Sequence, residues 1–324
     1  MIFRNRYPYF DIRKNNNQIM KTFRIIVFLF IIPFMAFAQT PEVMKLWPGQ
    51  APYSNGKATP EKESRQGSIS NIGEASLIIY RPEQGKANGS TVIICPGGGY
   101  TNESTIKEGH DVAKWFASFG VTGIVLKYRL PGADGITEKD KAPLSDAQRA
   151  IRYVRSKAAE WGLKPNQIGI MGFSAGGNLA VNAGTHFDAG NAQSTDAVEQ
   201  LSCRPDFMVL IYPVVSMAFD LTHMGSRLNL LGAHPDTTKV IYYSGEQNVT
   251  AETPPTFLVH ASDDKTVKVE NTINFFLAIH KFGTPVEMHI YEKGGHGFGL
   301  NQATGTALSW PDRCKGWMEQ RKLL

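Results

Sequence analysis

A serine set between two glycines is the residue with the clearest chemical potential. It lies in the run Gly172-Phe173-Ser174-Ala175-Gly176, directly after an apolar stretch and before a helical pattern. A strand that turns sharply into a helix leaves little room for side chains beside the turn and exposes the serine hydroxyl at the helix N-terminus. A serine that merely caps a helix is the alternative. The strand before the run and the helix after it favour Ser174 as a nucleophile.

A serine hydroxyl attacks efficiently only when a base removes its proton, so a histidine and an orienting acid are required. In a strand–turn–helix arrangement they follow the serine in the order acid, then histidine, each after a strand. Of the eight histidines, His296 fits best, because it follows the predicted strand 286–291 and has glycines on both sides. His260 and His289 lie at or within predicted strands and are interpreted as packing residues.

Two adjacent acids, Asp263 and Asp264, follow the predicted strand 256–259. Neighbouring side chains point apart, so only one of them can orient the histidine. Asp264 is favoured because it opens the run Asp264-Lys265-Thr266-Val267, whereas Asp263 then becomes a turn residue.

An oxyanion formed by attack on an ester needs preorganised N–H donors. The glycines 97–99 follow the predicted strand 91–95, and glycine allows the backbone to approach a substrate closely. We assign the donors to Gly98 and Gly99, with Ala175 supplying a third. Alone, a triple glycine predicts only a flexible turn, but here it precedes the serine in the expected order.

Short strand-like runs alternate with amphipathic helices along the chain. Strands are expected at 75–80, 91–95, 121–127, 167–172, 207–211, 256–259 and 286–291. Helices are expected near 112–119, over 144–161, after Gly176, near 273–277 and over 310–324. This alternation predicts an α/β fold with a mostly parallel central sheet covered by helices on both faces.

The domain organisation follows from where that pattern weakens. Residues 39–72 are rich in Pro, Gly, Ser and Lys and are expected to form an irregular lead-in. A weaker pattern predicts an insert at about 216–253, over one end of the sheet. We predict a single domain over residues 39–324.

The net charge of +5 belongs to the first 38 residues, which hold six Lys/Arg and one acidic residue. The remaining chain has 28 basic and 28 acidic residues, so a nucleic-acid partner has no electrostatic basis.

Lys21 and Arg24 precede an apolar run over 25–37 that ends in Ala-Phe-Ala, and these are the parts of a secretory signal peptide. That run is too short for a membrane anchor, which needs about 20 apolar residues. We expect translation to start at Met20 and the protein to be exported to the periplasm or outside the cell, with no stable membrane insertion after cleavage.

Cysteine usage and the absence of other motifs narrow the chemistry. Export implies an oxidising compartment, in which Cys203 and Cys314 could pair; the sequence leaves this open. Cys95 ends an apolar run and is expected to be buried. The chain has neither metal-ligand spacing nor a phosphate-binding glycine loop. We therefore expect no metal and no cofactor.

Taken together, these motifs make the chain similar to α/β-hydrolases of the hormone-sensitive-lipase-like esterase group. Within that group it most resembles the acetylxylan esterases and BD-FAE-type carbohydrate esterases. The resemblance covers about residues 75–300 and rests on the stretches 95–100, 127–131, 146–152, 169–176, 254–258, 263–264 and 295–297. It implies an α/β-hydrolase fold and places the catalytic triad on Ser174, Asp264 and His296.

The sequence departs from the lipase form of this group at Pro96, where the HGGG motif has histidine. That change affects the shape of the loop rather than its glycine donors. Tyr128, Arg129 and Asp146 also match the group and are interpreted as scaffold residues.

The resemblance implies an exported serine esterase that hydrolyses short acyl esters, acetyl above all, of carbohydrates such as xylan, through an acyl-enzyme on Ser174. General short-chain carboxylesterases and feruloyl esterases fit the same triad. A serine peptidase of the prolyl-oligopeptidase type is less favoured, because residues 39–324 leave no room for its propeller domain. A non-catalytic carbohydrate-binding protein is disfavoured because all three triad residues are present. The expected partner is a small-molecule or polysaccharide ester; the oligomeric state is not readable.

Overall fold

The computed structural model describes residue 2 and residues 41–324, except residues 58, 65 and 66. Apart from residue 2, the predicted leader at 1–38, with its signal peptide and the start at Met20, lies outside the described residues. Residues 41–324 cluster into one compact unit. Within the described ranges, no helix has the length and apolar character needed to cross a membrane.

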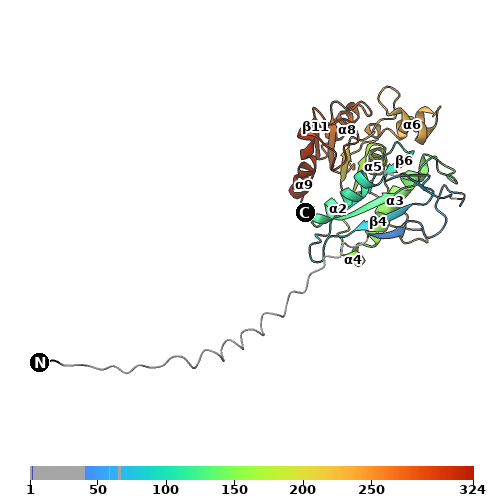
Figure 1. The fold of residues 1–324 in the computed structure, drawn as a ribbon. Helices are drawn as coiled ribbons and strands as arrows, with labels where there is room; N and C mark the ends of the chain where they lie inside the picture. The colour runs from blue at the N-terminus through green and yellow to red at the C-terminus, as the bar shows by residue number, and fades with distance from the viewer. Residues whose placement is uncertain (1, 3–40, 58, 65–66) are drawn as a thin grey trace. The chain divides into compact units, whose positions relative to one another are not determined.

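An eight-stranded sheet forms the centre of this unit (Figure 1). Its order is β1 (Glu42–Lys45), β4 (Ser76–Tyr80), β7 (Thr122–Lys127), β5 (Thr91–Cys95), β8 (Ile168–Phe173), β9 (Met208–Ile211), β10 (Thr256–Ala261) and β11 (Val286–Tyr291). From β7 to β11 every neighbouring pair is parallel, while β4 and β1 are added antiparallel. The predicted mostly parallel sheet is confirmed.

Helices cover both faces of the sheet because its central strands alternate between two apolar cores. On β5, Ile93 and Cys95 face one core, whereas Val92 and Ile94 face the other. The first core is completed by α3 (Lys141–Ser156), α5 (Ser174–Thr185) and α8 (Glu270–Lys281), and the second by α2 (Asp111–Ser118) and α9 (Trp310–Gln320).

The lead-in differs from its prediction as an irregular segment. β1 pairs with β4, and β2 (Lys62–Glu63) and β3 (Ser68–Ser70) join β6 (Asn102–Ser104) in a separate three-stranded sheet. These strands have two to four residues, too few for an alternating pattern to stand out. In addition, β1 and β4, and likewise β3 and β6, pair residues that lie about 30 positions or more apart along the chain.

The long helix predicted over 144–161 is divided. α3 ends at Ser156, α4 (Ala158–Trp161) follows, and the left-handed Gly162 ends it. Between them, the Lys157 amide donates to both the Tyr153 and Val154 carbonyls, a tightening typical of a helix end.

The region around 216–253 carries three short helical elements: α6 (Met224–Leu231), α7 (Thr237–Tyr242) and η2 (Gly245–Gln247). The amide of Asn229 on α6 donates to the Gly99 carbonyl at 2.8 Å and to the Thr101 hydroxyl at 2.7 Å. These bonds hold α6 against the loop that follows β5.

All three cysteines are buried and free. Cys95 lies in the core as predicted. The pairing of Cys203 with Cys314 that the sequence left open is not formed in this structure; Cys203 instead accepts a bond from the Asp188 amide.

Candidate active site

Strand pairing brings the predicted site residues to one edge of the sheet. Cys95 of β5 pairs with Gly172 of β8, so the loop after β5 and the turn after β8 start side by side. Ala261 of β10 pairs with Tyr291 of β11, which does the same for the loops that follow them. All four strands are parallel, so their carboxyl ends meet where ligands bind in open α/β sheets.

The turn after β8 holds Ser174 in an unusual backbone conformation. Ser174 begins α5 with a φ of 52°, in the left-handed region that side chains rarely adopt. The turn is tight enough that a Cβ at Gly176 would lie 2.2 Å from the Cys95 carbonyl oxygen. A strained residue at such a turn persists because its surroundings fix it, and strain of this kind concentrates at functional sites.

Ser174, His296 and Asp264 form a chain of hydrogen bonds. The Nε2 atom of His296 lies 2.9 Å from the Ser174 Oγ, and its Nδ1 atom lies 2.6 Å from Asp264 Oδ2. An ionised carboxylate only accepts, so Nδ1 carries the proton and Nε2 is free to accept from the serine hydroxyl. This is the tautomer that a general base toward Ser174 requires.

Asp264 is held by more than its bond to His296. Its Oδ1 accepts from the amides of Thr266 and Val267 at 2.8 and 2.9 Å. Burial acts to raise the pKa of Asp264, but the bonds from His260, His296 and the Val267 amide hold it well below its usual range. The carboxylate is therefore ionised at any pH at which the imidazole can act as a base.

The neighbouring acid has a different set of contacts. Asp263 Oδ1 accepts from the amides of Gly294 and Gly295 at 2.9 and 2.8 Å, at the start of the loop that carries His296. Asp263 thus fixes the backbone of the histidine loop, while Asp264 contacts the imidazole itself. The geometry supports the choice of Asp264 as the orienting acid.

The loop after β5 presents two free amides. Within the described residues, the N–H groups of Gly98 and Gly99 bond to no acceptor, while the amide of Gly97 bonds to Glu108. Gly98 has a φ of 138°, and a Cβ there would lie 2.0 Å from the Asn102 carbonyl oxygen, so only glycine fits. The Ala175 amide lies in the first turn of α5, where helix amides have no acceptor within their own helix.

The interpretation of His260 as a packing residue was incomplete. Its Nε2 lies 3.1 Å from Asp264 Oδ2 and 3.0 Å from the Val267 carbonyl, and its Nδ1 lies 2.7 Å from the Thr272 hydroxyl. His260 therefore binds the same carboxylate oxygen as His296. A histidine four residues before a candidate acid at a strand end was the available signal.

His223 is a second residue that sequence reasoning passed over. It caps the N-terminus of α6, where its Nδ1 accepts from the Ser226 amide at 3.3 Å. A Cβ at Gly99 would lie 3.8 Å from the His223 ring. Burial and the nearby His296 lower the pKa of His223. No local pattern marks this histidine, because only the packing of α6 brings it to the site.

Arg129 and Asp146 form a buried ion pair, in keeping with their interpretation as scaffold residues. Asp146 accepts from the Arg129 guanidinium at 2.7–3.0 Å, from the Arg129 amide at 2.9 Å and from the Trp47 indole at 2.7 Å. Tyr128 donates its hydroxyl to the Pro96 carbonyl at 2.8 Å. These bonds join the lead-in, the end of β7, α3 and the loop after β5, and none of them reaches Ser174.

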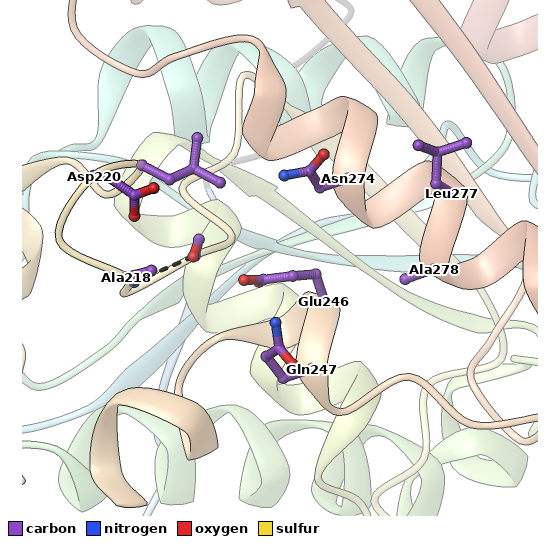
Figure 2. A pocket seen from close by; sticks show the side chains of 9 residues that line it. Ala218, Asp220, Glu246, Gln247, Asn274, Leu277 and Ala278 are labelled. Carbon is purple, nitrogen blue, oxygen red and sulfur yellow. Dashed lines mark hydrogen bonds between the residues drawn. The ribbon is translucent and has the colours of Figure 1, made fainter. Parts of the chain in front are cut away.

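A surface pocket of about 420 Å³ lies between the 216–253 region and α8 (Figure 2). Asp220, Glu246 and Asn274 are among its polar lining residues, and no triad residue lines it. The pocket is therefore separate from the Ser174–His296–Asp264 site. In the part of the chain that the structure describes, no cluster of three His, Cys, Asp or Glu side chains could hold a metal ion.

Comparisons with known proteins bear on the family and the fold of the chain. The BD-FAE family model matches residues 77–279. The chain is 34% identical over 249 residues to an acetylxylan esterase of Xylanibacter ruminicola, and 32% identical over 206 residues to endo-1,4-beta-xylanase B of Butyrivibrio fibrisolvens. These alignments cover 76% and 64% of this chain.

Among solved structures, an acetyl ester-xyloside bifunctional hydrolase from Caldicellulosiruptor lactoaceticus matches with a TM-score of 0.79 and 38% identity. The match covers 89% of this chain and 99% of that one. The likeness confirms the predicted α/β-hydrolase fold. The chain spans only 47% and 32% of the lengths of the two curated relatives.

Proposed function

The chain belongs to the BD-FAE family, and on that premise we propose that it is an exported serine esterase that hydrolyses short acyl esters of carbohydrates, acetyl esters of xylan above all. The single observation that carries the proposal is the hydrogen-bonded sequence Ser174–His296–Asp264 at the carboxyl edge of the sheet. Relatives named for acetylxylan and for acetyl ester-xyloside hydrolysis support the substrate class. Export rests on the signal-peptide pattern of residues 1–38.

In the proposed acylation step, the Ser174 Oγ attacks the ester carbonyl while Nε2 of His296 accepts the hydroxyl proton. The carbonyl oxygen becomes an oxyanion, to which the amides of Gly98, Gly99 and Ala175 donate. His296 then returns the proton to the departing alcohol oxygen of the sugar. The carbon–oxygen bond to the sugar breaks and the acyl group remains on Ser174.

Deacylation repeats these steps with water as the nucleophile. His296 accepts a proton from water, the hydroxide adds to the acyl-enzyme, and the carboxylic acid leaves as Ser174 recovers its proton. Asp264 stays ionised throughout and stabilises the imidazolium that forms in both halves of the cycle. No metal or cofactor takes part in this scheme.

The test is hydrolysis of acetyl, butyryl and octanoyl nitrophenyl esters and of acetylated xylan, by the wild type and by Ser174→Ala. We expect acetyl-selective turnover, acetate release from xylan, and a loss of kcat of about 10³-fold or more in the variant. Turnover of the nitrophenyl esters alone would indicate a general carboxylesterase. Release of ferulate from feruloylated xylan, with no acetate release, would assign a feruloyl esterase.

Absence of any Ser174-dependent turnover would overturn the proposal and favour a peptidase or a binding protein. Thermal unfolding of both proteins controls for folding, since Ser174→Ala removes one hydroxyl from a residue that is only 7% exposed.

A further inference from the structure

A buried carboxylate that the proposed mechanism does not use lies directly behind the site. Glu108 is 3% exposed and belongs to η1 (Ile106–His110), a single π-helical turn between β6 and α2. Its Oε2 accepts from the Gly97 amide at 2.9 Å, and its Oε1 accepts from the Tyr212 hydroxyl at 2.9 Å. A buried carboxyl group is costly unless it is hydrogen-bonded, so its retention here needs a reason.

Tyr212 continues this contact to the opposite loop. Its hydroxyl oxygen accepts from the Gly299 amide at 2.9 Å, three residues after His296. Because that oxygen accepts from Gly299, its own proton is available for Glu108. The Gly299 amide therefore donates to Tyr212, and Tyr212 donates to Glu108. Glu108 also accepts from the Gly97 amide.

The backbone and ring of Tyr212 show how firmly this residue is held. Tyr212 follows β9 with a φ of 39°, in the left-handed region, and is fully buried. Its ring lies 4.8 Å from the His296 ring and 4.6 Å from the Phe298 ring, measured between centroids. Two strained residues, Ser174 and Tyr212, thus follow adjacent strands at the same edge of the sheet.

The η1 turn has one more contact with the histidine loop. Lys107 donates to the Gly297 carbonyl at 2.8 Å. A single turn of the chain therefore holds the loop of Gly98 and Gly99 on one side and the loop of His296 on the other. Single-turn π-helical segments occur often at functional sites.

We propose that Glu108 and Tyr212 are positioning residues, which hold the loop of the oxyanion donors and the loop of the general base in fixed register across Ser174. Neither touches the substrate. The inference rests on the proposed esterase function. It adds to the triad a second set of residues on which the rate depends, because misplacement of reacting groups by about 1 Å can cost about 100-fold in rate.

Two substitutions break the connection without removing its bulk. Tyr212→Phe keeps the ring against His296 but removes the hydroxyl, which leaves Glu108 Oε1 and the Gly299 amide without their partner. Glu108→Gln keeps the shape, but its amide nitrogen must face either the Gly97 amide or the Tyr212 hydroxyl, so at least one bond reverses or breaks.

The experiment measures kcat and KM on acetyl nitrophenyl ester, together with the rate at which an organophosphate labels Ser174. We expect each variant to lose about 10- to 100-fold in kcat and in labelling rate, with KM within about twofold of wild type. The double variant should lose about as much as either single one, since both break one connection. The matched control is Tyr243→Phe, which removes a buried hydroxyl that bonds to the Asp140 carbonyl and to neither loop.

A kcat within about twofold of wild type in both single variants would overturn the proposal, as would losses that add in the double variant. Thermal unfolding separates these results from misfolding, and if Tyr212→Phe fails to fold, Glu108→Gln alone decides the test. A wild type that neither hydrolyses the ester nor is labelled at Ser174 refutes the proposed function itself, and this inference with it. A wild type that does both, beside variants that equal it, refutes only the inference.

Discussion

Asp264 and Asp146 are both buried, at 8% and 0% exposed, and each accepts at least four hydrogen bonds from backbone and side-chain donors. They differ in what lies beyond their partners. The Arg129 guanidinium that binds Asp146 also donates to the Pro52 and Ala142 carbonyls and to the Ser145 hydroxyl. The imidazole that binds Asp264 presents its second nitrogen to Ser174.

The comparison shows that neither burial nor the number of bonds separates a structural carboxylate from the one that we propose for the reaction. Arg129 is fully buried and each of its three guanidinium nitrogens bonds within the protein, so the ion pair joins segments of chain. His296 keeps 17% of its side chain exposed and stands where a substrate can arrive. The difference between the two carboxylates lies in what their cationic or imidazole partner contacts on its other side: other protein groups for Arg129, and Ser174 for His296.

Substitution of Asp264 should have the largest effect on activity. Asp264→Asn keeps the shape but can donate to Nδ1 of His296, which favours the wrong tautomer, so we expect kcat to fall about 10²- to 10⁴-fold. Steady-state hydrolysis of acetyl nitrophenyl ester measures it. The matched control is Asp263→Asn, which touches only the backbone of the histidine loop and should lose less than about tenfold. A larger loss in Asp263→Asn than in Asp264→Asn would reverse the assignment of the acid.

Substitution of Asp146 should show the opposite signature. Asp146→Asn leaves the buried Arg129 charge without its carboxylate, which costs about 3–5 kcal/mol in the free energy of unfolding. Urea denaturation measures this cost, and active-site titration gives kcat per folded molecule, which should stay within about threefold of wild type. Equal stability with lost activity would place Asp146 in the reaction site and end the distinction drawn above.

The smallest effect concerns acid stability. The pKa of Asp264 is lowered in the folded protein, so its contribution to stability is present above its unfolded pKa of about 4 and is lost as the pH falls further. Between about pH 4 and pH 3, the free energy of unfolding should fall more steeply with decreasing pH in the wild type than in Asp264→Asn. The difference in slope should be at most that of about one proton bound on unfolding. Urea unfolding at several pH values gives both slopes. Parallel slopes would show that the carboxylate gains nothing from its hydrogen bonds in the fold.

Local sequence predicted most of the elements that matter for the site. Glycines around Ser174 and 97–99 mark places where the chain turns or approaches itself closely, and such positions leave a signal in the sequence itself. β11 begins and ends where the pattern placed it, and β8 differs by a residue or so. The short strands β1, β2, β3 and β6 gave no such signal, since two to four residues cannot show a period.

Choices between neighbours depended on geometry. The run after β10 favoured Asp264, but only the contacts show that its carboxylate meets His296 while that of Asp263 meets the Gly294 and Gly295 amides. His260 was assigned to packing because it lies in a strand. In the structure its Nε2 lies 3.1 Å from Asp264 Oδ2, and the spacing of four residues between the two was the only hint of this contact in the sequence.

What the sequence by itself determined is the order of chemistry along the chain: a glycine loop, a serine turn, an acid and a histidine, each after a strand. This order can be predicted from residue types and from the backbone conformations that local turns require, because both depend only on residues a few positions apart. Only the tertiary structure decided that Glu108 and Tyr212 join the loops of Gly97 and Gly299, across sequence separations of 11, 104 and 87 residues. A hydrogen bond forms between atoms about 3 Å apart in space, whatever their separation along the chain. These contacts can therefore be identified only from the packed structure.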